Sequence, residues 1–125
     1  MDFRFDKLTV KAQESVAGAQ TLAAEKGTPE VDSLHLLATL VAPSEGIVKP
    51  ILDKVGVNFA QFSSLLDSEL DRLPKVSGGT TPQPNQALIQ VLQAAVREAD
   101  AMKDNFVSTE HLLLAIVKTP TICCN

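Results

Sequence analysis

The stretch VDSLHLLATLV at residues 31–41 returns 76 positions later as VSTEHLLLAIV at residues 107–117. The two segments share their first valine, the run His-Leu-Leu and their last valine, all in one register. Each segment carries a residue suited to capping a helix in its second position, Asp32 in the first and Ser108 in the second. The match extends further upstream, where it pairs Ala19 with Ala95 and Ala23 with Ala99. We interpret the match as an internal duplication of a helical unit.

The first copy opens with two expected helices. Apolar residues recur at three- and four-residue steps from Ala12 to Ala23, which is the spacing of one helical face. Thr9 is suited to cap this helix, and Gly27 is suited to end it. Asp32 is expected to cap a second helix that ends before Pro43.

Two further helices are expected in the first copy. A short one is predicted from Ile47 to Val55, with Gly56 as its stop. A longer one is predicted after the capping residue Asn58. Its apolar stripe consists of Phe59, Phe62, Leu65, Leu66, Leu70 and Leu73.

The second copy is shorter than the first. Leu88 begins a helical stripe that reaches Ala99, and Ser108 is expected to cap a last helix with Leu112, Leu113, Ile116 and Val117. Nothing after Val117 corresponds to the third and fourth helices. We therefore predict one all-α domain over residues 1–125, made of a first repeat (about 1–73), a linker (74–84), a partial second repeat (85–118) and an atypical tail (119–125). The proline- and glycine-rich linker is expected to join the repeats, and packing across a groove between them is the alternative.

Composition excludes several classes of partner. The chain has 125 residues, 45% of them hydrophobic, and a net charge of −4 from 11 basic and 15 acidic side chains. Nucleic acid is not expected as a partner, because phosphate binding needs a concentrated basic surface and single-stranded binding uses aromatic rings that are scarce here. No apolar run approaches the roughly 20 residues that cross a bilayer, so no membrane association is expected. The adjacent pair Cys123 and Cys124 has no other cysteine to bridge, which favours a reducing, intracellular compartment.

Catalytic and metal-binding constellations are not expected. Gly78-Gly79 is followed by Thr80-Thr81 without the lysine that a phosphate-binding loop requires. The two histidines, His35 and His111, each stand beside leucines at the start of an apolar helix, so we interpret them as capping or packing residues rather than ligands. We expect no active site, no metal and no cofactor in this chain.

Four stretches carry a resemblance to a known family. They are FDKLTVKAQES at 5–15, VDSLHLLATLV at 31–41, LDRLPKVSGG at 70–79 and the run from QALIQVLQAAV to HLLLAIV over 86–117. These stretches resemble the N-terminal Clp repeat domain of the ATP-driven Clp unfoldases, and the RLPKVSGG stretch favours the ClpB-type disaggregases among them. The resemblance covers nearly the whole chain, and the pattern breaks after Lys118.

The resemblance implies a fold and a role. It implies a compact all-α bundle of two tandem four-helix repeats related by a pseudo-two-fold axis, with the second repeat truncated here. It further implies a mobile head on a hexameric ATPase ring in the cytoplasm, or in the stroma or matrix of an organelle. Such a head contacts unfolded or aggregated polypeptide and hands it to the pore, while ATP and magnesium are bound by the ring.

The resemblance also implies a polar surface cluster formed by Thr9, Asp104 and Glu110. Each residue has a structural explanation as well. Thr9 is suited to cap a helix, and Asp104 begins a turn. Glu110 stands in the first turn of a helix, where the helix dipole stabilises a carboxylate. A functional role is favoured more for Glu110 than for the other two, because the equivalent position in the first repeat holds Leu34.

A groove between the repeats is the expected binding surface on the same resemblance. Leu92, Ala94 and His111 are its candidate lining residues, with core packing as the alternative for each. The function predicted is recognition of unfolded polypeptide by apolar contact of about micromolar affinity or weaker. Docking of a folded adaptor or co-chaperone protein is the alternative function, and a small enzyme is disfavoured because no nucleophile–base pair can be assembled.

Overall fold

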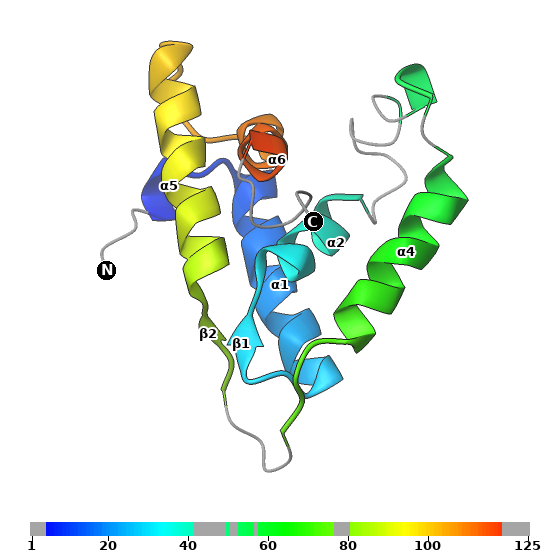
Figure 1. Cartoon of the computed structure of the whole chain (residues 1–125). Helices are drawn as coiled ribbons and strands as arrows, with labels where there is room; N and C mark the ends of the chain where they lie inside the picture. Colours follow the sequence, from blue (N-terminus) through cyan, green and yellow to red (C-terminus); the bar gives the residue numbers. More distant parts are fainter. Residues whose placement is uncertain (1–4, 42–49, 51–52, 57, 77–80, 119–125) are drawn as a thin grey trace.

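The computed structural model describes residues 5–41, 50, 53–56, 58–76 and 81–118. Helices dominate this part of the chain, which confirms the expected all-α class, and two strands of two residues each accompany them (Figure 1). In chain order the elements are η1 (Phe5–Lys7), α1 (Val10–Lys26), β1 (Glu30–Val31), α2 (Ser33–Val41), α4 (Phe59–Asp71), β2 (Gln83–Pro84), α5 (Gln86–Ala101) and α6 (Thr109–Lys118).

Helix α1 begins and ends where the sequence predicts. The Oγ1 atom of Thr9 accepts a hydrogen bond from the backbone N–H of Ala12 at 3.2 Å. Gly27 ends the helix with a positive φ of 75°, and its N–H bonds back to carbonyls of the last turn. A Cβ at Gly18 would lie 3.1 Å from the Thr39 side chain, so glycine lets α1 approach α2 closely.

Helix α4 is also capped as predicted, because Asn58 Oδ1 accepts from the N–H of Gln61 at 2.9 Å. Leu66 and Leu70 of its stripe are buried, but Leu65 is 62% exposed. The apolar residues of this helix are therefore not all buried, because its buried face is centred on Leu66. The predicted short helix over 47–55 lies largely outside the described residues, and its expected stop, Gly56, has a φ of 86°.

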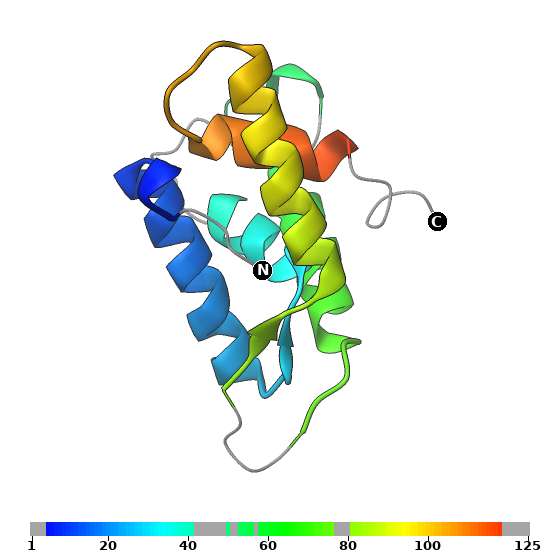
Figure 2. The same ribbon diagram turned by 90° about the vertical axis from the view of Figure 1, so that its left-hand side faces the viewer.

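Two short parallel pairings join the halves of the chain. Strand β1 pairs with β2 through Val31 and Pro84, and an isolated bridge pairs Leu8 with Val107. These pairings are equivalent, because Leu8 and Pro84, like Val31 and Val107, stand 76 positions apart. Residues 83–84 of the expected linker therefore form a strand that pairs with β1 of the first half (Figure 2).

The hydrogen bonds beside these pairings repeat in the same way. The N–H of Thr9 donates to the carbonyl of Val107 at 3.0 Å, and the N–H of Asn85 donates to the carbonyl of Val31 at 3.1 Å. Asn85 caps α5 as Thr9 caps α1, with its Oδ1 accepting from the N–H of Leu88 at 3.0 Å. The internal match found in the sequence is thus a match of backbone geometry as well.

One apolar core fills the space between the halves. Helix α2 packs against α1, α4, α5 and α6, so it lies at the centre of the bundle. The largest fully buried apolar side chains are Val31, Leu36, Leu70, Leu88, Val91, Val107 and Leu112. Val117 is 66% exposed although it continues the apolar pattern of α6, because the described helices cover only the other faces of α6.

Replacement of Gly27 by alanine should lower the free energy of unfolding by about 1 kcal/mol. The cause is the left-handed backbone, because a Cβ at this position would meet only the carbonyl of Val76 at an ordinary 3.5 Å. Gly27→Asn should lose less, since asparagine tolerates this conformation better. Urea unfolding of both variants measures the difference, and equal losses would contradict the explanation.

Candidate functional site

The two histidines close the N-termini of α2 and α6 in the same way. His35 Nδ1 accepts the backbone N–H of Asp32 at 2.8 Å, and His111 Nδ1 accepts the backbone N–H of Ser108 at 2.9 Å. Each histidine stands three residues after its partner, which is the spacing of a capping box with an imidazole in place of the usual glutamate or glutamine. Both rings are buried, at 0% and 4% exposure. Their predicted capping and packing roles are confirmed.

These bonds fix which ring nitrogen carries the proton. A backbone N–H can only donate, so each Nδ1 is an acceptor and the neutral ring carries its hydrogen on Nε2. In His35 the Nε2 atom faces Thr28 Oγ1 at 3.3 Å, and in His111 it donates to Asp104 Oδ2 at 2.9 Å. Burial lowers the pKa of His35 below its usual 6.5, although nearby Asp32 opposes the shift. The first histidine is therefore a neutral group at physiological pH.

Three of the predicted site residues line one pocket. Asp104, Glu110 and His111 border a hollow of about 480 Å3 at the start of α6, together with Met102 and Phe106. Both of these apolar side chains are 53% exposed. The pocket therefore combines carboxylates with accessible apolar surface.

Thr9 lies beside this pocket rather than in its lining. Its backbone N–H bonds to Val107, and its hydroxyl is occupied in capping α1. The resemblance implied a polar surface cluster of Thr9, Asp104 and Glu110, and in the structure Asp104 and Glu110 line one pocket while Thr9 lies outside its lining. Asp104 holds His111, Thr9 caps a helix, and Glu110 lies exposed without a cation partner among the described residues.

A groove of about 400 Å3 lies between α1 and α5. Leu92 lines it and is 4% exposed, so it belongs to both the core and the groove wall. Val16, its equivalent in the first half, lines the same groove. The remaining lining residues are Gln13, Ala17, Gln20, Val31, Pro84 and Leu88. The residues of α1 were missed in the sequence, although the offset of 76 that pairs Val16 with Leu92 was available as a signal.

The other two candidate groove residues lie elsewhere. Ala94 is half-buried and packs against the core. It lies two residues from Leu92 and so on a different side of α5, because a helix turns by about 100° per residue. His111 borders the pocket at α6 instead. The structure therefore brings Asp104, Glu110 and His111 together, and it places Leu92 in the groove apart from them.

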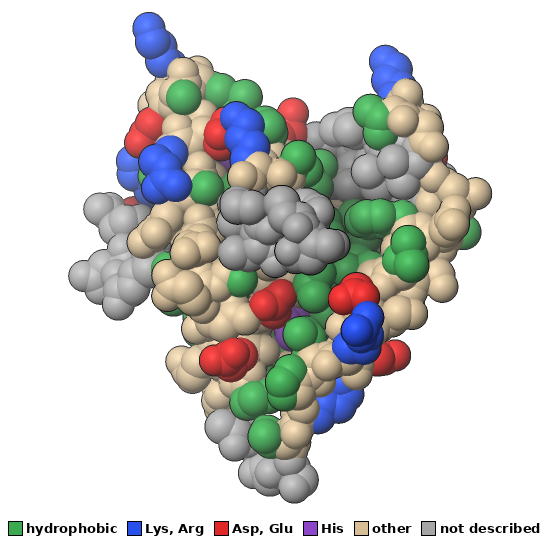
Figure 3. Space-filling model, in the orientation of Figure 1, with side chains coloured by type: hydrophobic (Ala, Val, Ile, Leu, Met, Phe, Trp, Pro, Cys, Tyr) green, Lys and Arg blue, Asp and Glu red, His purple; other side chains and the backbone are tan. Residues whose placement is uncertain are grey.

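A second hollow, of about 580 Å3, lies at the start of α2 and is the counterpart of the pocket at α6. Leu34 lines it where Glu110 lines the other. Helix α4 contributes Phe62 and Leu66, Leu73 follows just after the helix, and Figure 3 shows hydrophobic side chains gathered beside α4 on this face. The two halves thus share a backbone plan but differ in polarity at this position.

The part of the chain that the structure describes holds neither a candidate metal cluster nor a membrane-spanning helix. No group of three or more metal-ligating side chains is found among those residues. None of the helices described there is both long and apolar enough to cross a bilayer.

Comparison with known proteins identifies relatives along nearly the whole chain. A family model described as the Clp repeat (R) N-terminal domain matches residues 7–122. The chain is 43% identical to the chaperone protein ClpB of Rhodopirellula baltica over 119 residues, which cover 95% of this chain and 14% of that protein. It is 41% identical to the ClpB of Bdellovibrio bacteriovorus, over 89% of this chain and 13% of that protein. The chain therefore spans about a seventh of the length of these relatives.

Solved structures show the same fold. The N-terminal domain of Hsp104 from Candida albicans matches with a TM-score of 0.85 at 23% identity, covering 93% of this chain and 77% of that one. A ClpV N-domain in complex with a VipB peptide matches with a TM-score of 0.75 at 22% identity, covering 88% and 67%.

Replacement of His35 by glutamine should flatten the dependence of stability on pH. The pKa of His35 is lowered in the folded state, so below about pH 6.5 the unfolded chain binds a proton that the folded chain does not. The free energy of unfolding should then fall with decreasing pH, by at most about 1.4 kcal/mol per pH unit from this residue. Glutamine can keep the capping bond and does not titrate. Urea unfolding from pH 7.5 to pH 5 measures the slopes, and equal slopes in both proteins would contradict the assignment.

Replacement of Asp104 by alanine should cost about 1 to 3 kcal/mol of stability, because it leaves the buried Nε2–H of His111 without its acceptor. Asp104→Asn should retain most of the stability, since an amide oxygen can also accept. Glu110→Ala, at an exposed position, should cost no more than about 0.5 kcal/mol. Thermal unfolding of the three variants measures the order, and a loss in Asp104→Asn as large as in Asp104→Ala would refute this hydrogen-bond assignment.

Proposed function

Because the chain belongs to the family of Clp repeat N-terminal domains, we propose that it is the substrate-recognition domain of a ClpB-type protein disaggregase. It binds unfolded or aggregated polypeptide by reversible apolar contact and passes it to an ATPase ring. The relatives of highest identity reported above are ClpB chaperones several times longer than this chain, which supports a parent protein of this class.

The observation that carries this proposal is the groove between α1 and α5. Its lining is mostly aliphatic and includes Val16 from α1, Leu92 from α5, Val31 and Pro84. Unfolded clients offer apolar segments of varied sequence, and a shallow aliphatic surface suits weak and promiscuous capture of such segments. Affinity for any one segment is then about micromolar or weaker.

The polar residues at the start of α6 supply a second contact in this proposal. Glu110 is exposed, and Asp104 is half-exposed while it holds His111. Carboxylates beside Met102 and Phe106 provide hydrogen-bond acceptors next to apolar surface. Together with Thr9 they contact backbone or polar groups of a client outside the groove.

The wider assembly follows from the same family. The parent is a homo-hexamer whose ring binds ATP and magnesium outside this chain, in the cytoplasm or in an organellar stroma or matrix. This domain itself acts by binding, with no catalytic step and no cofactor. Nucleic acid and membrane are not among its partners in this proposal.

Docking of a specific protein is the second candidate function. A related fold, the ClpV N-domain, has been solved in complex with a VipB peptide. The apolar groove could therefore take a defined segment of an adaptor or co-chaperone. Selective binding of one folded protein, with indifference to unfolded chains, would favour this alternative.

Replacement of Ala17 by glutamate tests the groove. Ala17 is exposed and lines the groove, so the new carboxylate stands at its mouth without entering the core. The affinity of this variant for a permanently unfolded, carboxymethylated protein should fall about tenfold or more, because binding of an apolar segment would have to desolvate the new charge. Fluorescence anisotropy with the labelled client measures the change.

The matched control is Ala60→Glu, which adds the same charge at an exposed position on α4. It should leave the affinity within about twofold of the original. Equal losses in both variants would point to net charge rather than to the groove. No loss in Ala17→Glu would remove the groove from the proposal.

A further inference from the structure

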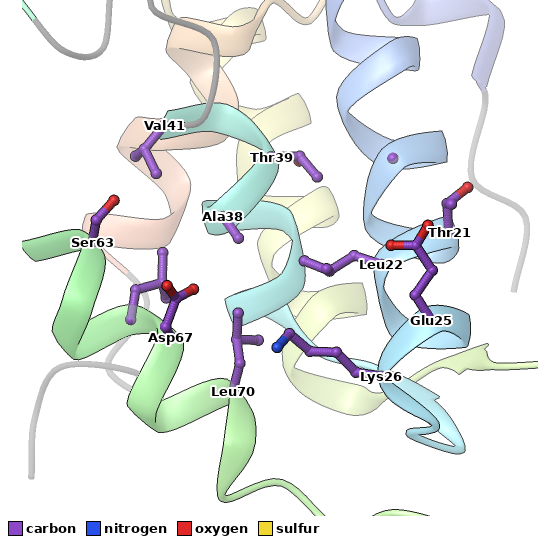
Figure 4. A pocket seen from close by; sticks show the side chains of 12 residues that line it. Thr21, Leu22, Glu25, Lys26, Ala38, Thr39, Val41, Ser63, Asp67 and Leu70 are labelled. Atoms are coloured by element: carbon purple, nitrogen blue, oxygen red, sulfur yellow. The ribbon is translucent and has the colours of Figure 1, made fainter.

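A separate cleft lies on the far side of α1 from the groove. Helices α1 and α4 flank α2, and together they enclose a volume of about 490 Å3 (Figure 4). At one end an ion pair joins the last residues of the two flanking helices, with Lys26 Nζ 3.2 Å from Asp71 Oδ1. From this end the ribbons of α1 and α4 run apart (Figure 1).

The floor of the cleft is aliphatic and contains small residues. Leu22, Ala38 and Leu70 point into the space between the helices. The small side chain of Ala38 leaves room above α2, whereas its equivalent in the other half is Leu114. The cleft is therefore a feature of the first half, and its volume lies within the usual range of ligand pockets.

The walls of the cleft carry unbalanced negative charge. Glu25 on α1 and Asp67 on α4 stand on opposite walls, and both are exposed. The described part of the chain provides no cation for either carboxylate, since the nearby Lys26 is paired with Asp71. Two carboxylates across an apolar floor attract a cationic group that is attached to an apolar one.

We propose that this cleft binds a short peptide segment in which an aliphatic side chain is followed closely by lysine or arginine. The aliphatic side chain lies on Leu22, Ala38 and Leu70, and the cation lies between Glu25 and Asp67. This site goes beyond the proposed function, which rests on the groove between α1 and α5.

The two surfaces are independent because they use opposite faces of α1. Gln13 lines the groove and Leu22 lines the cleft. Nine residues separate them, which is about two and a half helical turns and places them on opposite sides. One chain can therefore hold a segment in each surface at the same time.

The probe is a fluorescein-labelled ten-residue peptide of leucine, alanine and two lysines, and its counterpart has both lysines replaced by glutamate. Anisotropy titration with the original protein should show saturable binding of the lysine peptide at low salt. Its affinity should fall about tenfold in the double variant Glu25→Lys, Asp67→Lys, because two attractive contacts become repulsive. The glutamate peptide should bind the original protein at least tenfold more weakly than the lysine peptide does.

Two control proteins separate this site from the groove and from net charge. The variant Glu14→Lys, Glu98→Lys makes the same charge change at positions outside the cleft lining, and it should bind the lysine peptide as the original does. Ala17→Glu should also bind it unchanged, even where it no longer binds an unfolded client. Three outcomes would each overturn the cleft as the site. They are equal affinity for the two peptides, an equal loss of affinity for the lysine peptide in both charge variants, and a loss of that affinity in Ala17→Glu. None of these outcomes would remove client binding from the groove, and loss in Ala17→Glu would assign the peptide to the groove instead.

Discussion

Two equivalent backbone pairings hold the architecture together. The segment before α1 pairs with the segment before α6, and the segment before α5 pairs with the segment before α2. Each half is therefore completed by the other, and neither pairing could form within one half alone. Because the pairings hold the first turns of α1 and α5 in fixed places, they also set the separation of these helices. The groove between the two helices is a direct result of that constraint.

The histidine caps show how a duplicated unit diverges without losing its fold. Both rings bind a backbone N–H through Nδ1, so both must present an Nε2–H on the other side. The first half meets that hydrogen with the hydroxyl of Thr28, and the second meets it with the carboxylate of Asp104. The partner of the first histidine is therefore a buried, uncharged hydroxyl. The partner of the second is a carboxylate that lies half-exposed at the surface. A structural requirement has thus placed a carboxylate beside the exposed apolar side chains of Met102 and Phe106.

Local signals in the sequence were sufficient to predict these helices and where they begin and end. Thr9, Asn58 and Gly27 act as predicted because capping depends on side chains within a few residues. The pairing of residues around Leu8 with Val107 was not predictable in the same way, since it joins positions far apart in the chain. Leu92 was expected in a groove and lines one, but its partners on α1 are determined by tertiary packing. The cleft beside α4 carries no motif at all, because it depends on where α2 places the small side chain of Ala38.

The proposed function depends most on the groove between α1 and α5 as the surface that receives unfolded polypeptide. A backbone amide NMR titration of this chain with an unfolded, apolar-rich polypeptide tests this role of the groove directly. We expect saturable shifts that are largest at Val16, Gln20, Leu88 and Leu92, with smaller shifts at Glu110 and its neighbours. A well-dispersed spectrum that does not change at millimolar concentrations of the polypeptide would contradict it.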